Sequence, residues 1–362
     1  MKRTFLRAAA CSIAAALLLC PCKAMSLSAQ SAIVTDGATG RVLYEKNADE
    51  KSLIASTTKI MTGLLICQQC SPESRVQIPK EAVNIEGSSM YLQAGEILSV
   101  RELLYGLMLR SGNDAAVALA MFCDGSVEAF ARRMNEKAQA LGLHSTHFAN
   151  PHGLDDSGNY STARDMAVLA AYAMEDPEFR RIVSTKSVTV GSRHLVNHNK
   201  LLWQYDGAVG VKTGYTKAAG RILVSAAERN GRRIIAVTVN APNDWADHKK
   251  LLDFGFSAYR SVPVLTEGEA VLQVRVLGSS RKTVHAAPAE SFSCPAAQDE
   301  TISLQLHLPR FLFAPVEAGS HAGRAVILAN GKPVGETELF WLEDAKPQKP
   351  DKLSVLRRRL GG

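Results

Sequence analysis

A serine and a lysine stand directly before an apolar segment, at Ser56, Lys59 and residues 60–66. If this segment is a helix, residues three apart lie on one face, and the amine can reach the hydroxyl. Ser56 then lies in the first turn, where backbone N–H groups and the helix dipole favour developing negative charge. Lys59 could take the hydroxyl proton if its surroundings hold the amine neutral. The pattern predicts a nucleophilic serine at the start of a buried helix, although Ser/Lys pairs on solvated helix faces are common.

Two more polar tripeptides follow, Ser111-Gly-Asn113 and Lys212-Thr-Gly214. The first lies between apolar segments with helical spacing, residues 100–109 and 115–122, where buried polar groups need hydrogen-bond partners. The second lies in a segment predicted to be a strand. In this order, the three motifs resemble the signature set of penicillin-binding proteins and class A β-lactamases. We therefore expect the three motifs to meet in one cleft.

Other copies of these motifs have simpler explanations. Ser157-Gly-Asn159 lies in a segment rich in Gly, Asn and Asp, where turn formation alone accounts for it. Ser279 and Lys282 lie in a strand-rich region with no helix behind them. Three histidines are expected in loops or at the surface rather than in a Ser-His-Asp triad: His144, His147 and His152.

Hydrophobic periodicity predicts an α+β fold with an antiparallel sheet. A hairpin is expected over residues 32–35 and 41–45, and three more strands over 209–215, 222–227 and 233–239. Helices are expected over 56–69, 100–109, 115–122, 127–141, 162–174 and 247–259. After Pro177 the chain is expected to turn to strands. From residue 263, short alternating segments predict a small all-β domain.

The 362-residue chain is long enough for two domains. We expect a signal peptide at 1–24, a catalytic domain at 25–262, a β-rich domain at 263–345 and a basic tail at 346–362. The first segment has a basic start and an apolar run too short for a comfortable membrane span, so export is expected. Without its four cations the chain carries 38 basic and 35 acidic residues, which disfavours a nucleic-acid partner.

Four cysteines remain after this segment: Cys67, Cys70, Cys123 and Cys294. Cys67-x-x-Cys70 could be redox-active or half of a metal site, but no second pair or histidine cluster completes a metal site. We interpret the four as buried thiols or a structural disulfide, and we expect no metal.

The chain is similar to the serine D-alanyl-D-alanine carboxypeptidases, the low-molecular-mass penicillin-binding proteins. Four segments carry this resemblance beyond the three motifs: residues 86–92, 104–116, 150–154 and 212–221. Residues 241–248 resemble the sporulation-associated members. The resemblance covers about residues 30–345 and implies a β-lactamase/transpeptidase-like catalytic domain with a helical subdomain, followed by a small all-β domain. It implies removal of the terminal D-alanine from peptidoglycan stem peptides, outside the cytoplasm, without a cofactor.

The resemblance implies roles for three catalytic residues. Ser56 is the expected nucleophile that forms an acyl-enzyme, Lys59 the expected general base, and Ser111 the expected relay of protons to the leaving group. The sequence leaves open whether Lys59 or a network through Ser111 removes the Ser56 proton. The expected substrate is the peptidoglycan pentapeptide that ends in D-Ala-D-Ala. β-Lactams are expected to be covalent inhibitors that acylate Ser56.

Five further residues are expected to bind the substrate. Asn113 positions the substrate amide or Lys59, and Lys212 supplies fixed positive charge. Thr213 binds the substrate carboxylate, and Gly214 leaves room for the substrate to lie beside the strand. The backbone N–H groups of the nucleophile and of Tyr215 form the oxyanion hole.

Two departures from the family leave questions open. The tail has only four apolar residues among prolines and arginines, so peripheral membrane contact through the C-terminus is an open expectation. The segment that carries a carboxylate-binding arginine in some members reads Pro242-Asn-Asp-Trp-Ala246 here, so Arg221 or Thr213 alone could serve.

Three alternative functions are weighed. A class A β-lactamase is disfavoured because residues 150–161 hold no glutamate and because such enzymes lack the β-rich domain. A non-catalytic wall-binding scaffold is disfavoured because all three motifs are intact. A DD-endopeptidase acting on cross-links cannot be separated from a carboxypeptidase by sequence.

Overall fold

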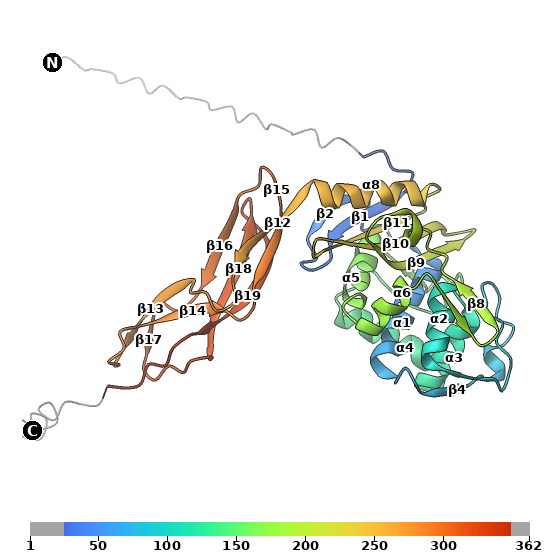
Figure 1. The fold of residues 1–362 in the computed structure, drawn as a ribbon, viewed down its shortest axis with the longest axis horizontal. Coiled ribbons are helices and arrows are strands. Elements are labelled where there is room, and N and C mark those ends of the chain that lie inside the picture. Colours follow the sequence, from blue (N-terminus) through green and yellow to red (C-terminus); the bar gives the residue numbers. More distant parts are fainter. Residues whose placement is uncertain (1–24, 349–362) are drawn as a thin grey trace, which may run out of the picture.

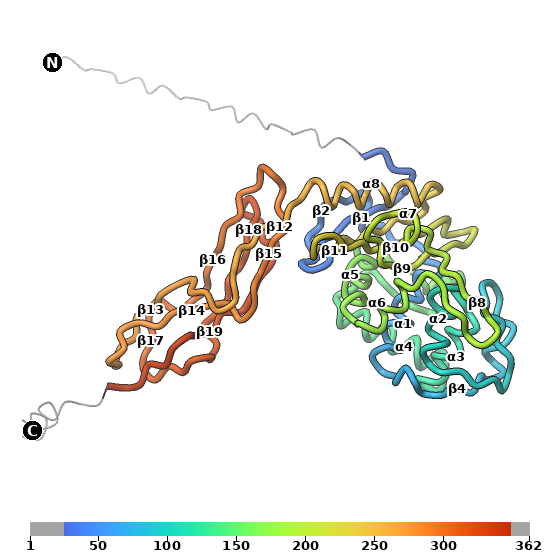
Figure 2. The backbone as a smooth tube through the Cα atoms, in the orientation of Figure 1, coloured from blue at the N-terminus to red at the C-terminus, as the bar shows by residue number. Residues whose placement is uncertain are grey.

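The computed structural model describes residues 25–348. These residues form two parts, one in which helices pack on a sheet and an elongated one made of strands (Figure 1). The predicted α+β class with an all-β C-terminal part is confirmed. The chain passes from the first part to the second where α8 (Asp244–Ser257) leads into β12 (Tyr259–Leu265), as Figure 2 shows. The predicted signal peptide and most of the predicted tail lie outside the described residues.

An antiparallel sheet with the strand order β2-β1-β11-β10-β9 forms the centre of the first part. Its strands are β1 (Ser31–Asp36), β2 (Val42–Lys46), β9 (Ala208–Thr216), β10 (Gly220–Arg229) and β11 (Arg232–Val239). β10 and β11 join through Asn230 and Gly231, which have φ values of 52° and 74°. Positive φ at both positions is what a two-residue hairpin turn requires. β9 is an edge strand of this sheet.

Both faces of this sheet are covered. α8 lies along one face, over β1, β10 and β11 (Figure 1). The other face carries a helical subdomain, in which α5 packs directly on β1 and β11. Its helices are α1 (Lys59–Gln69), α2 (Val100–Leu109), α3 (Asn113–Asp124), α4 (Val127–Ala140), α5 (Ala163–Ala173) and α6 (Pro177–Ser184). α1 contacts five of these elements, α2 to α6, and therefore lies at the centre of the subdomain.

Short elements connect the sheet and the helices. Two of them are 3-10 helices, η1 (Ala55–Thr58) and η2 (Lys80–Ala82), and one is a single helical turn, α7 (Leu201–Gln204). The others are the strand pairs β3 (Ser52–Leu53) with β6 (Tyr160–Ser161), β4 (Arg75–Gln77) with β5 (Ile97–Ser99), and β7 (Ser187–Val190) with β8 (Arg193–Val196).

Capping side chains fix where two of the helices begin. Ser99 and Glu102 form a reciprocal capping box at the start of α2. Thr162 accepts the N–H of Asp165 at the start of α5, as the Thr-x-x-Asp spacing predicts. These caps satisfy backbone donors that the first helical turn leaves without partners.

The expectation that the chain turns to strands after Pro177 is wrong for residues 177–184, which form α6. Asp176 accepts the N–H groups of Glu178 and Phe179, and Pro177 occupies the first helical turn. An aspartate cap followed by proline favours a helix start, which explains this difference. Strand structure begins afterwards with β7 and β8.

The second part consists of strands around a separate hydrophobic core, which includes Trp341, Leu339 and Ile327. β12 pairs with β15 (Phe292–Ala297). A larger sheet has the order β16-β18-β19-β14-β13-β17. Its strands are β13 (Leu272–Leu277), β14 (Thr283–Pro288), β16 (Ile302–His307), β17 (Phe311–Phe313), β18 (His321–Ala329) and β19 (Lys332–Trp341). The guanidinium of Arg41 joins the two parts by bonding the Pro295 carbonyl and the Glu300 carboxylate.

Within residues 25–348, every helix falls short of the length or apolar character needed to cross a membrane.

Candidate active site

The Ser56 turn is a 3-10 helix that leads directly into α1. Ala55 has a φ of 45°, and Thr57 donates its N–H to the Ile54 carbonyl at 3.1 Å, so the chain turns sharply before Ser56. Ser56 is half-buried, whereas Lys59, the first residue of α1, is fully buried. The serine therefore reaches the surface at the beginning of a helix whose remaining turns are in the core.

Lys59 connects the first two motifs. Its Nζ lies 3.1 Å from Ser56 Oγ and 2.6 Å from Asn113 Oδ1, and it also donates to the carbonyl oxygen of His152. Burial and then the positive charge of Lys212 hold the pKa of Lys59 well below its ordinary value of 10.5. Removal from water disfavours the charged amine, so this site favours the neutral form.

The second motif is held in a strained turn between α2 and α3. Ser111 has a φ of 61°, a conformation that costs free energy for a residue with a side chain. Asn113 is fixed by two bonds to the preceding loop: its N–H to the Ser88 carbonyl at 2.7 Å and its Nδ2 to the Glu86 carbonyl at 2.6 Å. The buried hydroxyl of Ser111 has no hydrogen-bond partner within the described part of the chain.

Asp114 explains why the loop before α2 stays in place. Its buried carboxylate accepts the N–H groups of Met90 and Leu92, each at 3.1 Å, and the hydroxyl of Ser89 at 2.6 Å. Three donors satisfy a carboxylate that burial would otherwise penalise. The loop that carries the carbonyl partners of Asn113 is thereby tied to α3.

The third motif lies on β9, which packs against η1. A Cβ added to Gly214 would lie 3.2 Å from the Ile54 carbonyl oxygen and from Thr57 Cγ2. The missing side chain therefore lets β9 approach the Ser56 turn. Gly214 still lines the cavity described below.

Lys212 and Tyr215 differ in exposure, although both lie on β9. Lys212 is buried, and its Nζ donates to the Thr213 carbonyl at 2.9 Å. Burial lowers the pKa of Lys212 from 10.5 to about 7. The side chain of Tyr215 is 64% exposed, and the residue lines the cavity described below.

A cavity of about 600 Å³ brings the motifs together. Five of the eight predicted site residues line it, and Lys59, Asn113 and Lys212 are buried residues beside it. Its lining consists of Ser56, Ser88, Ser111, Val196, Asn197, His198, Lys200, Trp203, Thr213, Gly214, Tyr215, Arg221, Asp244 and Trp245. A hydroxyl beside an amine held neutral, a second hydroxyl and a buried lysine are groups that suit nucleophilic acyl transfer.

Sequence reasoning missed the contribution of His152. We expected it in a loop or at the surface, and it does lie in a loop, but its carbonyl accepts from Lys59. The loop is fastened to α1 by the Thr62 hydroxyl, which donates to the Pro151 carbonyl at 2.6 Å. Resemblance of residues 150–154 to the family was the available signal, but backbone carbonyls leave no trace in side-chain motifs.

Arg221 and Asp244 form a second unexpected feature of the cavity. Arg221 Nη2 lies 2.8 Å and 3.1 Å from the two carboxylate oxygens of Asp244, and its guanidinium lies over the Trp245 ring. Arg221 is the cross-strand partner of Tyr215. An arginine is therefore held at the edge of the cleft although the chain has none in residues 242–246.

The other copies of the motifs, Ser157-Gly-Asn159 and the pair Ser279 and Lys282, lie in turns. Gly158 and Asn159 donate their N–H groups to Asp156, which is the turn chemistry expected there. Arg281 donates its N–H to the Ser279 hydroxyl, again within a turn.

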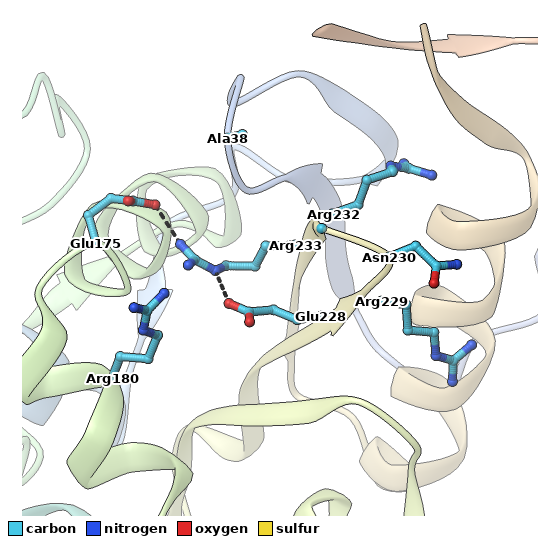
Figure 3. Close-up of a pocket in the computed structure, with 9 residues that line it drawn as sticks. Ala38, Glu175, Arg180, Glu228, Arg229, Asn230, Arg232 and Arg233 are labelled. Atoms are coloured by element: carbon cyan, nitrogen blue, oxygen red, sulfur yellow. Dashed lines mark hydrogen bonds and ion pairs between the residues drawn. The ribbon is translucent and has the colours of Figure 1, made fainter. Parts of the chain in front are cut away.

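A second cavity, of about 570 Å³, lies beside the β10–β11 hairpin and α6 (Figure 3). Arg233 is paired there with Glu175 and Glu228. The lining contains no serine, cysteine or histidine, and both of its glutamates, Glu175 and Glu228, are paired with Arg233. Among residues 25–348, no group of three or more His, Cys, Asp or Glu side chains could hold a metal ion.

Two family descriptions match the chain. The description "D-alanyl-D-alanine carboxypeptidase" matches residues 20–243, and "Penicillin-binding protein 5, C-terminal domain" matches residues 259–347.

Individual relatives match over most of their length. D-alanyl-D-alanine carboxypeptidase DacF of Bacillus subtilis is 35% identical over 92% of this chain and 89% of its own. D-alanyl-D-alanine carboxypeptidase DacC of Escherichia coli is 36% identical over 90% of this chain and 86% of its own. The crystal structure of penicillin-binding protein 5 from Haemophilus influenzae superposes with a TM-score of 0.79, at 31% identity, over 89% of this chain and 98% of that one.

Proposed function

This chain belongs to the D-alanyl-D-alanine carboxypeptidase family, and we propose that Ser56 carries the acyl-enzyme of its reaction. The protein is a serine D-alanyl-D-alanine carboxypeptidase of cell-wall metabolism. The observation that supports Ser56 is the buried Lys59 amine, which lies 3.1 Å from Ser56 Oγ. The sporulation role that residues 241–248 indicate stays a prediction.

Burial favours a neutral Lys59 amine, and the three polar neighbours of Nζ are compatible with that form. The His152 carbonyl can only accept, and so can Asn113 Oδ1, whose identity is fixed because Nδ2 donates to the Glu86 carbonyl. A neutral amine has two N–H groups, and these two acceptors use both. Its lone pair is then left for the hydroxyl hydrogen of Ser56. Lys59 is therefore the base that takes this proton.

In acylation, Ser56 Oγ bonds to the carbonyl carbon of the penultimate D-alanine, and the peptide C–N bond breaks. The proton taken by Lys59 passes to the departing amine through Ser111, whose buried hydroxyl is free to exchange hydrogen bonds. The backbone N–H groups of Ser56 and Tyr215 stabilise the oxyanion, a contribution of about 3–4 kcal/mol. Water activated by Lys59 then hydrolyses the ester, which releases the shortened peptide and restores Ser56.

The carboxylate of the terminal D-alanine is recognised on β9 and β10. Thr213 offers a hydroxyl within the cavity, Lys212 supplies positive charge beside it, and Arg221 reaches the same cavity from the neighbouring strand. Asp244 holds the guanidinium of Arg221 in position. Two cations and a hydroxyl donor match a carboxylate, which accepts through two oxygens.

The substrate backbone is expected to lie along β9. β9 is an edge strand beside Ser56, so an extended peptide can be added to the sheet there. This arrangement contacts the main chain of the peptide. It therefore gives little selectivity for the side chains that precede the two D-alanines. β-Lactams, which carry an acylating carbonyl and a carboxylate, are expected to acylate Ser56 by the same route.

Release of D-alanine from diacetyl-Lys-D-Ala-D-Ala tests this function. We expect release by the purified protein and a loss of at least about 10³-fold in Ser56→Ala, because Ser56 supplies the one hydroxyl that bonds Lys59 in the described part of the chain. Ser157→Ala is the matched control, since it alters the rival motif and should leave release unchanged. Wild-type release by Ser56→Ala would refute the assignment. Labelling of Ser56 by a fluorescent penicillin without release would instead favour an endopeptidase.

The protein is expected to act outside the cytoplasm, where peptidoglycan lies, at the cell wall or the outer face of the cytoplasmic membrane. Peripheral membrane contact is supported at the far end of the second part. Phe311 and Phe313 on the edge strand β17 are 51% and 69% exposed. Phe313 pairs with Leu277, and the next residue, Gly278, accepts the N–H of Gln348, where the described chain ends. Residues 349–362 contain five basic residues and one acidic residue, so an anionic bilayer fits this end.

A further inference from the structure

α1 and α3, the helices that begin at Lys59 and Asn113, pack against each other. The contacts at both of their ends, given below, indicate that they run in the same direction. Their first residues are joined by the Lys59–Asn113 hydrogen bond of 2.6 Å. Cys70 ends α1, eleven residues after Lys59, and Cys123 lies in the last turn of α3, ten residues after Asn113. A rise of about 1.5 Å per residue brings both cysteines to nearly the same height on the helix pair.

Further contacts place the two cysteines against each other. Cys70 and Cys123 are free thiols that lie close enough for each to shift the pKa of the other, and Asp124 and its partner Arg133 are charged neighbours of both. Both thiols are half-buried, and both side chains pack against the same hydrophobic core. The neighbouring thiol of Cys123 lowers the pKa of Cys70.

Cys67 and Cys294 are less suitable than Cys70 and Cys123 as a reactive pair. The neighbours of Cys67 include Asp176 and Glu178, at the start of α6, as well as Cys70. Burial raises the pKa of Cys67, which disfavours its thiolate. Cys294 is fully buried on β15 in the second part of the molecule.

We propose that Cys70 and Cys123 form a disulfide in the working enzyme, which fastens together the ends of the two helices that carry Lys59 and Asn113. The proposal uses the extracytoplasmic location given under the proposed function, because disulfides persist in exported proteins. The Cys-x-x-Cys spacing that drew attention in the sequence then has a different meaning, since Cys70 pairs across the subdomain and not with Cys67.

The bond forms by thiol–disulfide exchange with a small-molecule or protein disulfide. The Cys70 thiolate attacks one sulfur of that reagent, and the other sulfur leaves as a thiolate. Cys123 then gives up its proton and attacks the Cys70 sulfur of the mixed disulfide, which expels the second reagent thiol. Two electrons pass from the two cysteines to the reagent, which is reduced to two thiols.

The bond should stabilise the helical subdomain. It closes a long loop, residues 70–123, and restricts the unfolded chain accordingly. We expect the oxidised protein to melt about 5–15 °C above the reduced one. Exposed thiols should fall by two per molecule on oxidation.

Peptide mapping of the purified protein after treatment with oxidised glutathione tests the pairing. Trypsin should release residues 60–75, which contain Cys67 and Cys70, linked to residues 111–132, which contain Cys123. The linked peptide and the gain in Tm should vanish in Cys70→Ser and in Cys123→Ser. Both should persist in the matched controls Cys67→Ser and Cys294→Ser.

Three results would overturn the proposal: glutathione adducts without a linked peptide, a Cys67–Cys70 bond, or a link that survives in Cys70→Ser. Because the bond is read by mass and Tm, D-alanine release can be measured on the same samples as a separate test. A linked protein that releases no D-alanine would reject the proposed function and leave the disulfide standing.

Discussion

At the scale of single residues, Lys59 and Lys212 are two buried amines that serve opposite needs. Lys59 must be neutral to take a proton, whereas Lys212 must be charged to attract a carboxylate. Burial lowers the pKa of both, and the charge of Lys212 lowers that of Lys59 further. The site is therefore expected to hold one proton on Lys212 and a free lone pair on Lys59.

This difference predicts separate effects of pH on acylation and on binding. Acylation should rise with pH as Lys59 loses its proton, with a midpoint well below 10.5. KM for a substrate with a free carboxylate should rise above about pH 7, where Lys212 loses its charge. Rates of penicillin acylation and KM for the tripeptide, measured from pH 5 to 10, test both effects of pH.

Lys59→Arg supplies the control for the effect of pH on acylation. A guanidinium stays charged throughout this range, so acylation should fall by at least about 10²-fold and lose its rise with pH. An unchanged profile in this variant would assign the proton transfer to another group.

The position of Arg221 predicts that its replacement will impair only recognition of the substrate carboxylate. Arg221→Leu should raise KM for diacetyl-Lys-D-Ala-D-Ala by about 10–100-fold, the range for a hydrogen bond to a charged group. Arg221→Lys, which keeps the charge, should recover part of this loss. A substrate with a terminal amide should be affected much less, and an equal effect on both substrates would show that Arg221 acts only by packing on Trp245 and Asp244.

At the scale of elements, the site depends on how closely β9 approaches the Ser56 turn. Gly214 makes this approach possible, because a Cβ there would meet Ile54 and Thr57. The edge of β9 and the turn together define the width of the cleft and the spacing of the oxyanion donors.

Gly214→Ala should therefore lower kcat/KM by about 10²-fold, because small displacements in an active site are costly, and should change the melting temperature little. D-alanine release and thermal unfolding of the same preparation provide the measurements. Tyr215→Phe is the control, since it alters an exposed side chain at the next position and keeps the backbone N–H. Full activity of Gly214→Ala would show that a displacement of β9 does not impair the reaction.

The helices and the sheet show what sequence could and could not predict. Periodicity and continuous apolar runs located α1 to α5 and the five central strands, because these elements are largely buried against the core. Ser56, Lys59 and Asn113 act through their side chains, which the motifs identify. Their proximity in the folded protein could therefore be predicted from the sequence. The His152 carbonyl and the Arg221–Asp244 pair could not, because a backbone acceptor has no side-chain signature and a tertiary contact joins residues from separate elements.

At the scale of the whole molecule, the cleft and the exposed pair Phe311 and Phe313 lie in different parts, far from each other. Figure 1 shows β17 at the end of the second part that is far from α1, and the described chain ends beside it. Contact with a bilayer at β17 would hold the cleft away from the membrane surface, toward the wall.

Sedimentation with lipid vesicles checks this arrangement. The full chain should bind vesicles that contain phosphatidylglycerol, and the double variant Phe311→Ser and Phe313→Ser should bind at least about tenfold more weakly, because it loses two large apolar side chains. Leu304→Ser, on the opposite edge strand β16, is the control. Equal binding by the double variant would assign any membrane contact to the tail alone.

The turn at Ser111 has an energetic consequence for the enzyme without substrate. A left-handed conformation at a residue with a side chain costs about 1–3 kcal/mol. The folded protein bears this cost before a substrate binds. The Ser111 hydroxyl therefore already lines the cavity when a peptide arrives, and the turn needs no rearrangement before that hydroxyl moves a proton.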